Sequence, residues 1–201
     1  MIKMIRACAA VAFMLVLAGC QSSLMTRSSA TSVTVSPDDA TVVFLRPSSF
    51  GGAIQSSVYD VSGGATTFAG IVSAKTRVSM QLPAGQHLLM VIAENGDFLN
   101  ATLAPGKTYY VLVKPRMGVW KARFSLIPIH SDPAAKYNVR SKDFASWKAE
   151  CQPVVKTPAA DAWYQQHRAD IEAKRLEYMK KWDRMAPQDK AVLTLHAEDG
   201  V

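Results

Sequence analysis

The sequence predicts a mainly β fold: an antiparallel β-sandwich of about 7–8 strands with a C-terminal helical extension. Two observations support this prediction. Between residues 38 and 130, short apolar runs alternate with clusters of Gly, Pro, Ser and Asn, and no helical period interrupts them. After residue 131 the pattern changes, and a long stretch with helical spacing follows. We therefore expect a sandwich domain at 38–130 and a helical extension at 131–201.

Each expected strand ends at residues that break pairing or turn the chain. The strand at 41–46 stops at Pro47, and the strand at 87–93 is followed by the turn residues 95–97. The 87–93 run is apolar at nearly every position, as expected for a strand covered on both faces. The complete set of expected strands is 41–46, 57–61, 68–72, 77–82, 87–93, 98–103, 108–113 and 120–127.

The C-terminal extension is expected to contain two helices. Ser141 can cap a short helix over 141–148, and Pro153 and Pro158 then bracket a linker. A long helix is expected at 161–185, ended by Pro187, with the final residues frayed. Its apolar stripe can pack on the chain's own domain or form a surface for a partner protein or the bilayer. The stripe consists of Tyr164, Ile171, Tyr178, Trp182 and Met185.

The first residues have the order of an export signal. Lys3 and Arg6 precede an apolar run at 7–17, which is shorter than the roughly 20 residues that span a bilayer. The tetrapeptide Leu17-Ala18-Gly19-Cys20 resembles the lipobox of bacterial lipoproteins. We therefore expect a signal peptide at 1–19 and lipid on Cys20; the alternative is a plain secretory signal that releases a soluble periplasmic protein. Gln21 after the cysteine is typical of lipoproteins sent to the outer membrane.

Residues 20–37 are expected to be a flexible tether. They are rich in Ser and Thr with scattered apolar residues, which is typical of a linker. We therefore expect a domain that faces the periplasm from a lipid anchor in the outer membrane of a Gram-negative bacterium.

The charge of the chain does not indicate nucleic-acid binding. The net charge of +7 falls to +5 when Lys3 and Arg6 leave with the signal, and the remainder is spread along the chain. The densest positive stretch can be a solvated sheet face or can attract anionic headgroups or an acidic partner. This basic stretch comprises Lys107, Lys114, Arg116, Lys121 and Arg123.

The cysteines leave no internal disulfide under this interpretation. Cys8 lies in the signal, Cys20 carries lipid, and Cys151 is left without an intramolecular partner. Cys151 is expected to be a small core residue, with an intermolecular bridge or a reactive thiol as the alternative.

No pattern in the sequence predicts a catalytic or metal site. The four histidines are far apart and lack zinc-site spacing, so we expect each to be a lone surface or strand-end residue. They are His87, His130, His167 and His196. We expect no enzyme activity, no cofactor and no metal.

Three segments in a fixed order resemble a known family. They are residues 40–47, the motif Pro83-x-Gly85-x-His87, and residues 105–110. Together they look like an uncharacterised bacterial lipoprotein family, domain of unknown function 2846. The resemblance covers about residues 40–129 and implies a small β-sandwich similar to transthyretin-like or PEGA-like modules. The chain departs from the family at 58–70 and adds the helical tail.

Two functions follow as hypotheses. The first is a noncatalytic interaction module, held to the membrane by its lipid, that contacts another envelope protein or the cell wall. The second is a structural subunit of an envelope-spanning or secretion assembly, by analogy of architecture alone.

Overall fold

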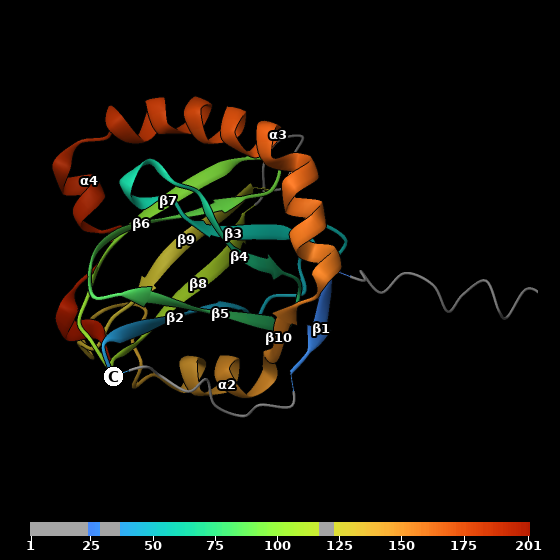
Figure 1. The fold of residues 1–201 in the computed structure, drawn as a ribbon. Coiled ribbons are helices and arrows are strands. Elements are labelled where there is room, and N and C mark those ends of the chain that lie inside the picture. The colour runs from blue at the N-terminus through green and yellow to red at the C-terminus, as the bar shows by residue number, and fades with distance from the viewer. Residues whose placement is uncertain (1–23, 29–36, 117–122) are drawn as a thin grey trace, which may run out of the picture.

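The computed structural model describes residues 24–28, 37–116 and 123–201. Two β-sheets face each other, and helices cover their outer faces (Figure 1). The mainly β sandwich with a C-terminal helix is confirmed, with eleven strands in the described residues instead of seven or eight.

The six-stranded sheet has the order β1 (Met25–Arg27), β10 (Gln152–Lys156), β5 (Thr76–Pro83), β2 (Asp39–Arg46), β8 (Thr108–Arg116) and β9 (Arg123–Ile129). The five-stranded sheet has the order β11 (Thr194–Leu195), β7 (Gly96–Leu103), β6 (Gly85–Ile92), β3 (Ser56–Asp60) and β4 (Thr67–Val72).

Both sheets are mixed, which corrects the expected antiparallel arrangement. Strand β2 pairs antiparallel with β5 but parallel with β8, and the pairs β10–β5 and β11–β7 are also parallel. A tight hairpin forces consecutive strands to be antiparallel, but long connections impose no such direction. The chain passes through both sheets between β2 and β8, so the sequence does not reveal their relative direction.

The core between the sheets is formed by the inward-facing residues of alternate strand positions. In β2, Val42 and Phe44 are fully buried in this core, while Val43 and Leu45 point to the opposite face and are also buried. The same holds for β6, where Leu89 and Val91 face inward and Met90 and Ile92 face outward. The prediction of a strand covered on both faces is confirmed for residues 89–92, whereas His87, Leu88 and Ala93 are only partly buried.

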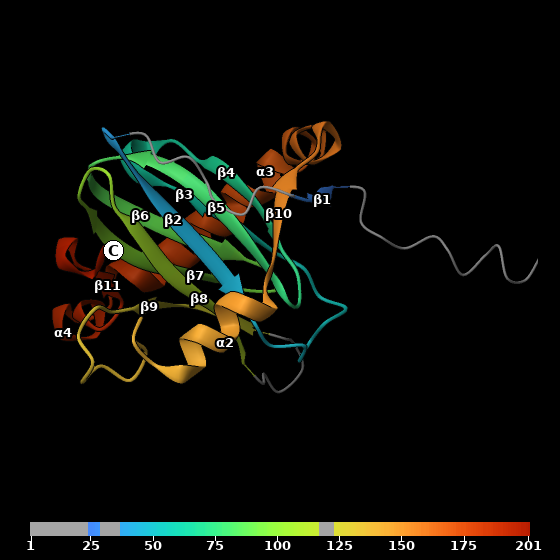
Figure 2. The ribbon, with the colours of Figure 1, turned by 90° about the horizontal axis from the view of Figure 1, so that it is seen from below.

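The outer faces are covered by the two main helices. Helix α2 (Lys142–Glu150) lies beside the six-stranded sheet (Figure 2). It packs Phe144 against that sheet, where the Phe144 and Tyr110 rings meet edge-on with centroids 4.8 Å apart. The Ser141 hydroxyl accepts a hydrogen bond from the Phe144 backbone N–H at 3.1 Å, which confirms the predicted cap.

Helix α3 (Pro158–Asp183) curves over the five-stranded sheet (Figure 1). Ile171 and Trp182 are buried against the sheet, and the Trp182 ring lies 5.9 Å from that of Phe98. The long helix is confirmed, as is the packing of its apolar stripe on the chain's own domain. It begins earlier than predicted because Pro158 occupies the first turn, where no backbone N–H is needed. A short helix, α4 (Pro187–Ala191), follows.

The C-terminal segment contributes strands to both sheets, so its description as a purely helical extension is wrong. The expected linker contains β10, in which Pro153 is tolerated because the neighbouring Gln152 backbone N–H, and not a donor at Pro153, bonds to the Lys75 carbonyl at 2.8 Å. The expected frayed end contains β11 and a 3₁₀ turn (Ala197–Asp199), and the Val201 backbone exchanges two hydrogen bonds with Thr108. The sandwich therefore extends beyond residues 38–130.

Part of the expected flexible tether is a strand. Strand β1 pairs antiparallel with β10, and the Met25 thioether accepts a hydrogen bond from the Ile71 backbone N–H at 3.4 Å. Gly70 makes this contact possible, because a Cβ at this position would lie 3.0 Å from the Met25 methyl group and its φ of +149° disfavours other residues. The flexible-tether prediction is wrong for residues 24–28. The expected signal peptide at 1–19, Cys20 and the remainder of the tether up to residue 36 lie outside the described residues.

Candidate functional site

The main candidate site is a groove between α3 and the outer face of the five-stranded sheet, with a volume of about 530 Å³. This volume is within the range of small-molecule sites, which is about 300–1,000 Å³. We call it the α3 groove. Its walls are mainly apolar and its rim is polar, and its residues are Leu24, Gln55, Ser57, Ile71, Ile92, Ala93, Trp163, His167, Asp170, Ile171, Ala173, Lys174 and Glu177.

The helical wall is formed by residues four positions apart on α3. Trp163, His167 and Ile171 follow each other along one face of the helix. The His167 Nδ1–H donates to the Trp163 carbonyl at 2.8 Å, and the two rings stack at 4.7 Å. The His167 ring is therefore held flat against the indole, so this side of the groove presents a continuous ring surface.

The sheet wall is formed by Ile71 of β4 and Ile92 of β6. The one hydroxyl on this wall, that of Ser57, donates to the Ile92 carbonyl at 3.2 Å. At the rim, the Lys174 ammonium donates to the Ala93 carbonyl at 2.9 Å, which ties the helix to the end of β6. The groove therefore has an apolar floor and charged groups at its mouth.

Leu24 places the N-terminal part of the chain at this groove. Its carbonyl accepts hydrogen bonds from the Thr157 backbone N–H at 3.0 Å and from the Thr157 hydroxyl at 3.1 Å, immediately before α3 begins. Leu24 is four residues after Cys20, the residue expected to carry lipid. Figure 1 shows β1 beside the start of α3 and β10.

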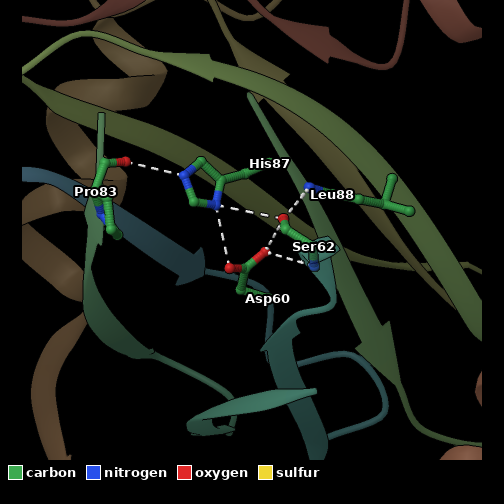
Figure 3. Close-up of polar contacts among 5 residues, drawn as sticks. All are labelled: Asp60, Ser62, Pro83, His87 and Leu88. Carbon is green, nitrogen blue, oxygen red and sulfur yellow. Dashed lines mark hydrogen bonds and ion pairs between the residues drawn. The ribbon is translucent and has the colours of Figure 1, made fainter. Parts of the chain in front are cut away.

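A second cluster brings together Asp60, Ser62 and His87 (Figure 3). The Ser62 hydroxyl donates to Asp60 and accepts from the Leu88 backbone N–H at 2.9 Å. Nδ1 of His87 lies 3.1 Å from the Asp60 carboxylate, and Nε2 lies 2.9 Å from the Pro83 carbonyl. The expectation that His87 is a lone residue is wrong, because its partner Asp60 lies on the neighbouring strand.

This cluster has the residue types of a catalytic triad but not its connections. A triad histidine uses one ring nitrogen for the carboxylate and the other for the serine hydroxyl. Here Nδ1 faces both Asp60 and Ser62, the latter at 3.4 Å, and Nε2 is occupied by the Pro83 carbonyl. The arrangement therefore fixes the turn after β3 against β6 and provides no base for Ser62.

A third cluster holds the C-terminus in place. The Asp199 carboxylate, almost fully buried, accepts from Nδ1 of His130 at 3.0 Å and from the backbone N–H groups of Ser131 and His196 at 2.9 and 2.8 Å. Burial raises the pKa of Asp199, but these hydrogen bonds and the nearby His130 outweigh it and lower the pKa below its usual value. The rings of His130 and His196 stack with centroids 6.4 Å apart, so the expectation that each is a lone residue is wrong.

The basic stretch is divided among separate surfaces. Lys114 donates to the Tyr137 hydroxyl at 2.9 Å below α2, and Lys121 lies outside the described residues. Arg116 and Arg123 are opposite each other on β8 and β9, and with Lys181 of α3 they line a polar pocket of about 380 Å³. This basic pocket also contains Asp97, 3.7 Å from the Arg116 guanidinium, whose pKa is raised by burial.

Arg46 is a buried charge that the sequence analysis did not single out. Its guanidinium is fully buried, has no carboxylate partner in the described part of the chain, and lies 4.5 Å above the Phe124 ring. It donates to four backbone carbonyls, those of Ile54 and Gly51 at 2.6 and 2.7 Å and those of Phe50 and Val72 at 3.3 Å. Burial lowers the pKa of Arg46 to about 10, which leaves it charged at neutral pH. The sequence feature that could have indicated this burial is the position of Arg46, a charged residue at the end of the apolar run 41–45.

Cys151 follows the last residue of α2 and is buried in the cluster between α2 and the six-stranded sheet, which confirms the prediction of a small core residue. Burial raises the pKa of its thiol to about 11, so the thiol stays protonated near neutral pH.

The described residues contain neither a metal-binding cluster nor a membrane-spanning helix. Within 24–28, 37–116 and 123–201, no group of three or more His, Cys, Asp or Glu could hold a metal ion. No helix in the same ranges has the length and apolar character needed to cross a membrane. In the comparisons with known proteins, no family model and no curated protein matches the chain.

Proposed function

We propose that the protein is a lipid-anchored envelope lipoprotein whose sandwich acts as a noncatalytic binding module on the periplasmic side of the outer membrane. One observation carries the proposal: the export signal ends in the lipobox-like sequence Leu17-Ala18-Gly19-Cys20. A thiol at this position accepts diacylglycerol through a thioether, and stable anchoring needs more than one acyl chain.

The position of β1 supports a domain held close to the bilayer. Because β1 is paired with β10, the linker between Cys20 and the folded domain is reduced from the expected 20–37 to residues 20–23. Four residues span at most about 14 Å when fully extended. The face of the sandwich near Leu24 therefore lies within that distance of the lipid anchor.

The side-chain clusters support binding in place of catalysis. Asp60 and Ser62 are used in hydrogen bonds that hold the turn after β3, and Asp199 holds the C-terminus. The α3 groove and the basic pocket are two surfaces open to ligands, the first apolar and the second lined by Arg116, Arg123 and Lys181. The resemblance to the lipoprotein family of unknown function stays a prediction.

The lipid anchor is tested by intact mass and membrane fractionation of the full chain expressed with its leader. We expect the wild type to gain acyl mass, lose residues 1–19 and sediment with the outer membrane. Cys20→Ala should lose the acyl mass, while the matched control Cys151→Ala should keep it. An unmodified, soluble wild type would contradict the proposal and would indicate the plain secretory alternative.

The binding role is tested by a photocrosslinking residue placed in the basic pocket. A crosslinker at Lys181 should capture an envelope component, and a crosslinker at the exposed Lys142 of α2 should not. Capture of a single partner supports the interaction module. Capture of several subunits of one large complex would favour the structural-subunit hypothesis instead, and equal capture from both positions would contradict specific binding at this pocket.

A further inference from the structure

We propose that the α3 groove holds one acyl chain of the lipid carried by Cys20. The inference rests on the proposed function and adds a binding site for that same lipid. The other chains of the anchor remain in the bilayer, so one lipid connects the groove to the membrane and fixes which face of the domain lies against it.

The shape and chemistry of the groove suit an alkyl chain. The floor is formed by Ile71, Ile92 and Ile171, and the Trp163 indole forms one side. The Ser57 hydroxyl on the wall already has an acceptor, the Ile92 carbonyl, so it demands no polar ligand. The charged groups, including Asp170 and Glu177, are at the mouth, which is where the carbonyl end of a chain and water would meet.

The position of Leu24 identifies the source of the chain. Leu24 both lines the groove and is the first described residue after the lipidation site, and its carbonyl is fixed by Thr157. The four-residue separation limits the distance from Cys20 to at most about 14 Å. A ligand tethered by so short a linker is present at an effective concentration of the order of millimolar, whereas a free lipid must first leave the bilayer.

The energetics also favour occupation. Moving a chain from bilayer to groove exchanges one apolar environment for another and so costs the chain little. Ile71 and Ile92 are already buried, so filling the groove removes mainly the half-buried Trp163 side chain from water, which is favourable in proportion to the area covered.

The test uses the full chain in cells fed a palmitate analogue with a photoreactive diazirine near its end. After irradiation, proteolysis and mass spectrometry identify which peptides are joined to the Cys20 lipid. We expect crosslinks to groove peptides, those containing Trp163, Ile171 or Ile92. Label on Cys20 with crosslinks to phospholipid alone would overturn this inference and leave the proposed anchor intact; no label on Cys20 would overturn both.

Two groove-filling variants and one matched control sharpen the test. Gln55→Trp and Ala173→Trp place an indole at the groove from opposite walls, and both positions are exposed, so neither change disturbs the core. Each should lower the yield of groove crosslinks about tenfold, which corresponds to about 1.4 kcal/mol. Gln165→Trp, at an exposed position of α3 that does not line the groove, should leave the yield unchanged. Equal yields in all four proteins would overturn the proposal.

A final arm separates the protein's own lipid from bilayer lipid. In Cys20→Ala the labelled chains are present only in membrane phospholipid. Groove crosslinks should then disappear. If labelled phospholipid reaches the same groove peptides in Cys20→Ala, the occupant is a bilayer lipid and the proposal of an own-chain ligand is wrong.

Discussion

Replacement of Arg46 by Met is expected to loosen the loop at 47–55 and to destabilise the sandwich. The substitution removes a guanidinium that donates to four carbonyls, three of which belong to that loop. The fourth, from Val72, keeps a partner because the Ser56 hydroxyl also donates to it at 3.0 Å. The loop carbonyls can reach water, so the cost is the loss of their bonds more than the creation of buried unpaired groups.

The magnitude follows from two opposing effects. Hydrogen bonds to a charged group contribute about 1.5–3 kcal/mol each, so the two short bonds to Gly51 and Ile54 account for about 3–6 kcal/mol. Against this, the pKa of Arg46 falls from 12.5 to about 10 because of burial, and removing the buried charge returns about 3 kcal/mol at 1.36 kcal/mol per pKa unit. We therefore expect Arg46→Met to lower the free energy of unfolding by up to about 3 kcal/mol.

Urea unfolding followed by tryptophan fluorescence measures the stability, and limited proteolysis measures the loop. Cleavage within 47–55 should appear under native conditions in Arg46→Met and be absent in the wild type. Arg168→Met, on the exposed surface of α3, is the control and should change stability by less than about 0.5 kcal/mol. If Arg46→Met matches the wild type in both stability and loop cleavage, the carbonyl contacts do not hold the loop and the argument is wrong.

Three further predictions concern the other buried polar groups. Because the pKa of Asp199 is lowered in the fold, its contribution to the free energy of unfolding is present above about pH 4 and is lost as the pH falls through the folded pKa. Urea unfolding at pH 6 and pH 3 should therefore show a smaller loss of stability on acidification for Asp199→Asn than for the wild type. Equal losses would contradict the role of this carboxylate. Ser62 should not react with a fluorophosphonate probe, and labelling of Ser62 would refute its structural role. Ser62→Ala should lower the free energy of unfolding by about 1–2 kcal/mol, because the Leu88 N–H and the Asp60 carboxylate each lose a hydrogen-bond partner. The Cys151 thiol should react with a maleimide at pH 8 at least about tenfold more slowly in the native protein than in urea, since its pKa is about 11; equal rates would show that it is not buried.

The strands could be predicted where the sequence shows both an apolar run and the residues that end it. The run at 41–46 is followed by Pro47, and the Ser141 cap sets the start of α2; both features appear as expected. Strands β10 and β11 were missed because they are five and two residues long, and β10 contains a proline. Their existence depends on pairing with β5 and β7, which no local pattern encodes.

The histidine clusters were missed for a related reason. His130 and Asp199 are 69 residues apart in sequence, and His87 and Asp60 are 27 apart. Spacing rules detect ligands that share one helix or one turn, whereas strand pairing and the return of the C-terminus bring these groups together. Spacing in the sequence therefore could not reveal these clusters, and the connections of Nδ1 and Nε2 of His87 speak only for the Asp60 cluster; the absence of enzyme activity stays a prediction.

The incomplete burial of α3 explains why a groove remains beside it. Over its 26 residues only Ala160, Ile171 and Trp182 are buried. Between the first two, the helix presents Trp163 and His167, which are half-buried. Ile71 and Ile92 beneath them are buried, so the open side of the groove lies along these two rings. This apolar groove lies where Leu24 connects the domain to its expected anchor, and this coincidence of cavity and attachment point favours a lipid as its occupant.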